Sequence, residues 1–140
     1  MINDKNMPTK GGSASGGKKI LIVEDEQDLC EALIDKLGRE GFLPRGAKDG
    51  EEGLELALKE HPDLILLDIV MPKMDGMTMF KKLREDKWGK NVPVILLTNL
   101  SATDEKLIKA MVENEPAYYL VKSDWKINDV VEKVKETLEK

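Results

Sequence analysis

Side chains capable of chemistry end or follow four short apolar runs of this sequence. Glu24 and Asp25 follow the first run, Asp68 ends the second, Thr98 ends the third and Lys122 follows the fourth. Three carboxylates repel one another, and burying them together is costly unless a cation compensates their charge. A hard divalent ion such as Mg²⁺ meets that need and prefers to share its shell with a phosphate. A carboxylate beside it can attack phosphorus, and the hydroxyl and the ammonium group can stabilise the phosphoryl oxygens.

The spacing of apolar residues changes along the chain between a strand-like and a helix-like period, which predicts alternating strands and helices. On the helix that begins at Gly50, we expect Leu54, Ala57 and Leu58 to share the inward face. Short alternating elements favour right-handed crossovers and a parallel sheet covered on both faces, which is a three-layer α/β sandwich. We expect strands at 19–24, 42–47, 64–68, 92–98 and 118–121, and helices at 28–40, from 50 onward, at 77–86, 104–114 and 128–138.

Topology gives the polar residues a common location. In an open parallel sheet, ligands bind outside the carboxyl ends of the strands, at the point where the strand order reverses. The acids, Thr98 and Lys122 all stand at such ends. Each residue alone is also compatible with an ordinary solvated position at a strand end. Their joint placement favours a site.

Composition narrows the class of protein. The chain has 140 residues, 35% of them charged, and no apolar run of the roughly 18 residues that a membrane span needs. Its one cysteine, Cys30, excludes an internal disulfide framework and indicates a reducing cytoplasm. The net charge is −5, and the first 19 residues carry +3 of their own. The acidic remainder argues against nucleic-acid binding.

Residues 1–18 are expected to be a flexible Gly/Ser/Lys leader, with the folded domain at 19–140. Gly12, Gly17 and Lys18 match part of a phosphate-binding P-loop, but Lys19 stands where Ser or Thr is needed to hold Mg²⁺. The expected strand also follows this segment instead of preceding it. We therefore interpret the segment as a linker.

Five motifs together resemble the receiver domain of two-component response regulators. They are VEDE at 23–26, DIVMPKMDG at 68–76, Thr98, and Tyr119 and Lys122 within YLVK at 119–122. The resemblance spans about residues 18–140. It implies a bacterial protein with a flavodoxin-like fold of strand order 2-1-3-4-5, a phosphoprotein that accepts its phosphoryl group from a sensor histidine kinase.

The resemblance also implies a role for each matching residue. Asp68 would be the phosphoacceptor. Asp25, Asp68 and the backbone carbonyl of Val70 would ligate Mg²⁺ (or Mn²⁺), and Glu24 would act through a metal-bound water. Lys122 would contact the phosphoryl group, and Thr98 and Tyr119 would form the switch pair.

Signalling would then pass through the face formed by the fourth helix, fifth strand and fifth helix. Since the sequence ends at Lys140, soon after the last helix, we expect a stand-alone regulator that signals to a partner protein or forms a homodimer. Such a module supports its own phosphotransfer and dephosphorylation and is not an enzyme in the usual sense. A shuttle that passes phosphate to a histidine phosphotransfer protein is an alternative.

Four departures from the family pattern affect the expected site. Ser123 follows the lysine where proline is usual, Asn99 replaces a small residue, and 115–116 (Glu-Pro) replaces a Gly-containing turn. Val70 and Leu100 are apolar where polar side chains can position an attacking water. The apolar character of these two positions predicts that a phosphoryl group on Asp68 is long-lived.

Two other function classes fit parts of the pattern. A phosphohydrolase of the haloacid dehalogenase type also uses Asp, Thr and Lys at strand ends, but it needs a second acid where this chain has Val70. A flavin- or dinucleotide-binding protein would need a G-x-G-x-x-G after the first strand, and none is present. His61 is expected at the surface and Cys30 as an inert core residue.

Overall fold

The computed structural model describes residues 17–69, 74, 76–98, 109, 113, 118–121 and 126–139; for 98 and 118–121 the description covers the backbone. The strands are β2 (Lys19–Val23), β3 (Leu43–Ala47), β4 (Leu64–Asp68), β5 (Val94–Thr98) and β6 (Tyr118–Val121). The helices are α1 (Gln27–Arg39), α2 (Gly50–Glu60), α3 (Gly76–Glu85) and α5 (Ile127–Leu138). Residues 1–16 of the leader expected at 1–18, and all of the helix expected at 104–114 except 109 and 113, lie outside the described residues.

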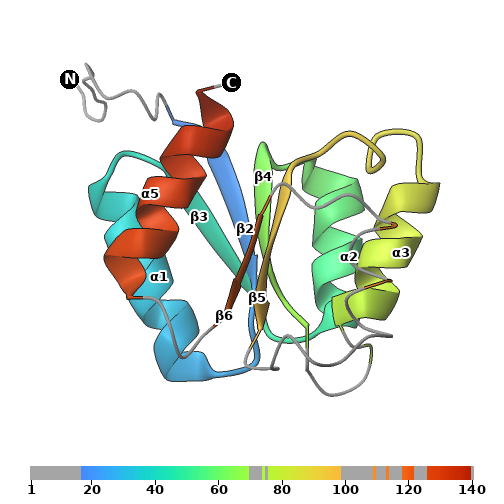
Figure 1. The fold of residues 1–140 in the computed structure, drawn as a ribbon, viewed down its shortest axis with the longest axis horizontal. Helices are drawn as coiled ribbons and strands as arrows, with labels where there is room; N and C mark the ends of the chain where they lie inside the picture. Colours follow the sequence, from blue (N-terminus) through green and yellow to red (C-terminus); the bar gives the residue numbers. More distant parts are fainter. Residues whose placement is uncertain are drawn as a thin grey trace.

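The five strands form one parallel sheet in the order β3-β2-β4-β5-β6. Counted along the chain, this is the order 2-1-3-4-5 of the flavodoxin-like topology, as expected. Helices α1 and α5 cover one face of the sheet, and α2 and α3 cover the other (Figure 1). The strand order reverses between β2 and β4, which places the switch point at their carboxyl ends.

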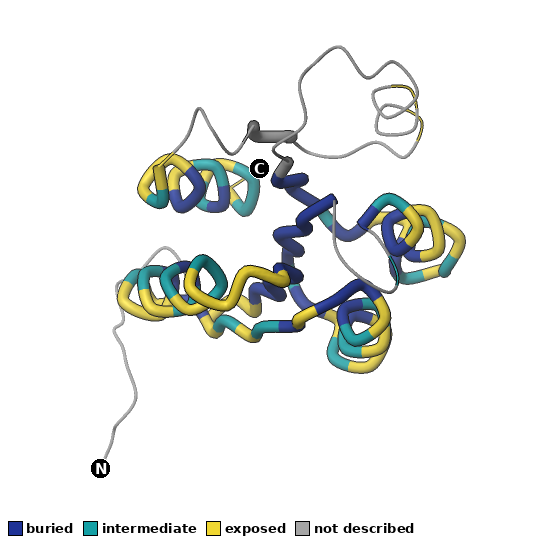
Figure 2. Tube along the Cα trace, turned by 90° about the horizontal axis from the view of Figure 1, so that it is seen from below, coloured by how far each residue is buried: buried dark blue, intermediate teal, exposed yellow. Residues whose placement is uncertain are grey.

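Apolar side chains of the central strands alternate between two core clusters, because successive residues of a strand point to opposite faces. Leu21 and Val23 of β2 belong to the cluster under α2 and α3, whereas Ile20 and Ile22 belong to the cluster under α1 and α5. The buried sheet lies between helices whose outer sides are exposed (Figure 2).

Local sequence explains the start of α2 and the turn after α1. Asp49 caps α2, because its side chain accepts a hydrogen bond from the amide of Glu52 at 2.8 Å. After α1 ends, Gly41 takes a φ of 95°, a conformation that favours glycine. α1 begins one residue before the expected start and ends one before the expected end, which is the usual uncertainty of helix ends.

One expectation about α2 is wrong. Leu58 is 38% exposed, whereas Ala57 is fully buried and Leu54 packs against the core as a partly buried residue. The buried face of α2 runs through Gly53 and Ala57, and a residue one position further along is turned by about 100° around the helix axis. In the part of the chain that the structure describes, no helix combines the length and apolar character needed to cross a membrane.

Candidate metal and phosphoryl site

Strand register brings two of the predicted acids together. The last paired residues of β2 and β4 are Val23 and Leu67, so Glu24 and Asp68 occupy the next position on each strand. The Glu24 amide donates to the carbonyl of Ala47 at 3.0 Å, which extends the pairing with β3 by one residue. Glu24 and Asp68 therefore share the sheet face that carries α1 and α5.

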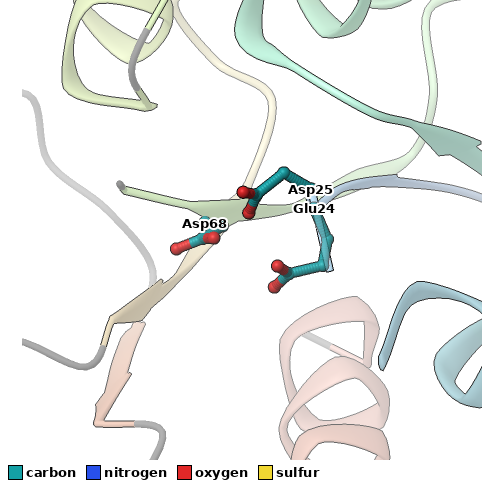
Figure 3. Close-up of side chains that lie close together, drawn as sticks. All are labelled: Glu24, Asp25 and Asp68. Atoms are coloured by element: carbon teal, nitrogen blue, oxygen red, sulfur yellow. The ribbon is translucent and has the colours of Figure 1, made fainter. Parts of the chain in front are cut away.

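Three carboxylates gather at this edge. One carboxylate oxygen from each of Glu24, Asp25 and Asp68 lies within 4.8 Å of the others, and their side chains converge in Figure 3. Glu24 is 1% exposed and Asp68 is 3% exposed, while Asp25 is open to solvent. Oε2 of Glu24 accepts a hydrogen bond from the amide of Glu26 at 3.0 Å, which orients that carboxylate.

The donor set fits a hard divalent cation. All three side chains offer carboxylate oxygens, and the exposed position of Asp25 leaves one side of the cluster accessible to water and to a phosphate. Mg²⁺ is bound in proteins by one or two carboxylates together with waters and phosphate oxygens. Soft metals prefer thiolate ligands, so the cluster favours Mg²⁺ or Mn²⁺.

A pocket of about 460 Å³ opens beside the cluster, and Glu24 and Asp25 form part of its wall. Cys30 lines the same pocket, and burial, with smaller contributions from the carboxylates of Glu24 and Glu31, raises the pKa of its thiol. The thiol therefore stays protonated at neutral pH and is a poor nucleophile or metal ligand. The expected inert character of Cys30 agrees with this environment, although the residue is half-buried and not part of the fully buried core.

The backbone places Thr98 at the same edge of the sheet as the acids, and Tyr119 further back on the neighbouring strand. Asp68 pairs with Leu97, and the next residue of β5 is Thr98, which pairs with Val121 at the end of β6. Tyr119 pairs with Leu96, two residues before Thr98. The side chains of Thr98 and Tyr119 are outside the description, as are several other residues on which predictions were made: Val70, Asn99, Leu100, 115–116, Lys122 and Ser123.

Sequence reasoning missed two backbone contacts that Ile69 and Met74 make after β4. The amide of Gly76 donates to the carbonyl of Ile69 at 2.7 Å, and the amide of Gly50 donates to the carbonyl of Met74 at 3.1 Å. Both glycines are the first residue of a helix, and each follows an aspartate in the sequence. The repeated Asp-Gly pair was the available signal, but it indicated only turns.

Fold and site together define a class: flavodoxin-like α/β proteins with a carboxylate cluster at the topological switch point. A family model described as the response regulator receiver domain matches residues 20–135. The chain belongs to the response regulator receiver domain family, whose members accept a phosphoryl group and bind Mg²⁺ at an acidic pocket.

Named relatives support the assignment. The alkaline phosphatase synthesis transcriptional regulatory protein PhoP of Bacillus subtilis is 43% identical over 94 residues, which cover 67% of this chain and 37% of that protein. The response regulator PleD of Caulobacter vibrioides is 37% identical over 89 residues, covering 64% of this chain and 20% of that protein. The chain thus spans well under half the length of these curated relatives.

Solved structures agree in fold. A Francisella response regulator receiver domain superposes with a TM-score of 0.78 at 29% identity, covering 87% of this chain and 97% of that one. The response regulator TrrA of Thermotoga maritima, solved in complex with Mg²⁺ and beryllofluoride, gives a TM-score of 0.71 at 34% identity and covers 85% of this chain and 97% of that one.

Proposed function

We propose that Asp68 accepts a phosphoryl group from the phosphohistidine of a sensor kinase in a reaction that requires Mg²⁺. The observation that carries this proposal is the approach of three carboxylates to within 4.8 Å at the carboxyl edge of the sheet. A carboxylate oxygen of Asp68 forms the new P–O bond, and the bond from phosphorus to the histidine nitrogen breaks. The product is an aspartyl phosphate.

Each acid has a separate task in this proposal. Asp25 and Asp68 would hold the ion directly, together with the backbone carbonyl of Val70, and the buried Glu24 would hold it through a water. When bound, the ion neutralises charge on the carboxylates and on the incoming phosphoryl oxygens. The structure of TrrA in complex with Mg²⁺ and beryllofluoride supports, by analogy, an ion and a phosphoryl group at this edge of the sheet.

The remaining predicted residues act on the phosphoryl group and on the switch. Lys122 neutralises a phosphoryl oxygen, and Thr98 donates a hydrogen bond to another. Movement of Thr98 toward the phosphoryl group frees space for the ring of Tyr119. This biases the face formed by 104–114, β6 and α5, which a partner protein or a second copy of the chain reads.

The phosphoryl step can be tested with acetyl phosphate and Mg²⁺, without a known kinase. The wild-type chain should gain one phosphoryl group per molecule by intact mass, and Asp68→Asn should gain none. Asp28→Asn is the matched control, because it removes an exposed acid of α1 outside the cluster. Normal labelling of Asp68→Asn would overturn the proposal. So would a wild-type chain that is neither labelled by acetyl phosphate nor able to bind beryllofluoride.

A further inference from the structure

Two helices begin in contact with the segment that follows the phosphoacceptor strand. Helix α3 begins at Gly76, where a Cβ atom would lie 2.0 Å from the carbonyl oxygen of Asp68 itself. Helix α2 begins at Gly50, where a Cβ atom would lie 2.2 Å from the carbonyl oxygen of Met74. Real Cβ contacts are never this short, so each glycine permits a close approach of two backbones.

Backbone conformation does not require glycine at position 50. Positive φ angles among the described glycines occur at Gly17 and Gly41, and Gly50 has helical geometry within α2. Alanine has the higher helix propensity by about 1 kcal/mol, so the helix alone would favour a side chain here. What excludes a side chain is the carbonyl of Met74, which accepts the amide hydrogen of Gly50 at 3.1 Å.

The start of α2 is itself firmly held. Asp49 is 5% exposed and caps the helix through the amide of Glu52. One turn later Gly53 packs on β2, where a Cβ atom would lie 2.8 Å from both γ-methyl groups of Val23. Val23 directly precedes Glu24, so one rigid helix end contacts both the strand that carries the metal-binding acids and the segment after Asp68.

We propose that Gly50 is a positioning residue for phosphoryl acceptance on Asp68: by admitting the carbonyl of Met74 against the first turn of α2, it fixes the backbone at a point six residues after the phosphoacceptor. The inference rests on the proposed function. Gly50 contacts neither the phosphoryl donor nor the ion in this scheme. It acts through the backbone, and the geometry of an in-line attack is sensitive to shifts of about 1 Å.

The test compares Gly50→Ala with Gly89→Ala. Gly89 is a matched control, because it is buried at the far end of α3 and a Cβ atom there would lie 2.1 Å from the carbonyl oxygen of Leu83. Both variants thus force a side chain against a backbone oxygen, and only one does so beside Asp68. The readouts are thermal stability, the limiting rate of labelling by acetyl phosphate at saturating Mg²⁺, and the acetyl phosphate concentration that gives half that rate.

At temperatures where both variants are folded, Gly50→Ala should lower the limiting rate about tenfold, because the acceptor segment is displaced. Gly89→Ala should remain within about twofold of the wild-type rate, since loss of stability alone does not change the rate of folded molecules. The acetyl phosphate concentration that gives half the limiting rate should change little in either variant. Equal limiting rates for the two variants would overturn the positioning role.

A second variant decides the matter if Gly50→Ala does not fold. Asp49→Ala removes the cap and loosens the first turn of α2 without adding a clash, so it should lower the limiting rate in the same direction, by about threefold or more. An unchanged rate for Asp49→Ala would also overturn the inference. If the wild-type chain is not labelled at all, both the proposed function and the role of Gly50 are wrong. If the wild-type chain is labelled normally and the variants have the same limiting rate as the wild-type chain, only the role of Gly50 is wrong.

Discussion

Glu24 and Asp68 occupy corresponding positions at the ends of β2 and β4, and both are buried with carboxylate oxygens within 4.8 Å of one another. Two negative charges at this separation repel by roughly 3–4 kcal/mol at an effective dielectric constant of about 20. A bound dication would turn this net repulsion into a net attraction, because each carboxylate would then face a positive charge. This repulsion between the two carboxylates therefore opposes stability in the metal-free protein.

The first prediction concerns the stability cost of the acid cluster. In EDTA, Asp68→Asn should be more stable than the wild-type chain by about 1–3 kcal/mol, because it removes one of the repelling charges. Mg²⁺ should stabilise the wild-type chain by about 1.4 kcal/mol for each tenfold excess over its Kd, and should stabilise the variant much less. Urea unfolding with and without Mg²⁺ measures both effects.

Asp28→Asn serves as the control for this experiment, because Asp28 is an exposed acid in the first turn of α1 and lies outside the cluster. It should retain the full response to Mg²⁺. Equal stabilisation of Asp68→Asn and the wild-type chain by Mg²⁺ would contradict the assignment of Asp68 to the ion.

The second prediction concerns the lifetime of the phosphoryl group. Val70 and Leu100 are apolar at positions where a polar side chain can hold an attacking water. The double variant Val70→Asn, Leu100→Glu should therefore lose its label at least several-fold faster, because general-base and positioning effects typically contribute about 10²–10⁴ in rate. The measurement is decay of the labelled mass after removal of acetyl phosphate. Unchanged decay would show that water access is set elsewhere.

Much of the fold can be predicted from the spacing of apolar residues alone. Runs such as LILLD and VILLT are short and almost entirely apolar, which favours strands buried on both faces, and their spacing leaves room for one crossover helix between them. The acid cluster follows from the same reasoning, because parallel strands bring their carboxyl ends to one edge. Glu24, Asp25 and Asp68 were placed together on that basis, and the structure confirms their proximity.

Other features depend on contacts that no local pattern encodes. The exposure of Leu58 reflects where α2 touches the sheet, and that rotation is set by the close packing of Gly53 on Val23. The contact between Gly50 and Met74 joins residues that are 24 positions apart in the sequence. From the sequence, a glycine in a helix indicates only a low helix propensity. The contact with Met74 in the folded structure shows why a side chain is excluded.

The third prediction separates Trp88 from the metal site. Its ring stacks on that of His61, with centroids 4.3 Å apart and an interplanar angle of 11°. His61 follows α2 and precedes β4, so the pair lies at the amino edge of the sheet, opposite to Asp68. In a Trp125→Phe background, Mg²⁺ should leave the emission of Trp88 unchanged, because the ring is remote from the acids.

His61→Ala is the positive control for that measurement. Loss of the stacked ring exposes more of the partly buried indole to water, so the emission should shift to longer wavelength. A response of Trp88 to Mg²⁺ in the presence of His61 would mean that the metal site and the amino edge of the sheet are coupled.

The last prediction concerns an ion pair that joins two helices on the same face of the sheet. Lys135 of α5 donates a hydrogen bond to Glu40 at the end of α1. This hydrogen bond lowers the pKa of Glu40 and raises the pKa of Lys135. For the acid, the stabilisation is present above its unfolded pKa of about 4.3 and is lost as the pH falls through the lowered folded value. For the base, it is present below about 10.4 and is lost as the pH rises through the raised value.

A double-mutant cycle with Glu40→Gln and Lys135→Met measures the pair. Glu40→Gln also removes the second contact, from Lys36 to Glu40 at 3.6 Å, but this loss is common to the single and the double variant and cancels in the cycle. Because both side chains are partly exposed, the coupling should be only about 0.2–1 kcal/mol at pH 7, and it should shrink at high salt. It should fade as the pH falls below the unfolded pKa of about 4.3 and through the lowered pKa of Glu40, because the carboxylate then takes up a proton. The pair of Arg39 with Asp35 within α1 is the control, because it is more exposed and joins no second helix. A coupling for Glu40 and Lys135 that is the same at pH 7 and in acid would show that the contact stabilises through packing and not through charge.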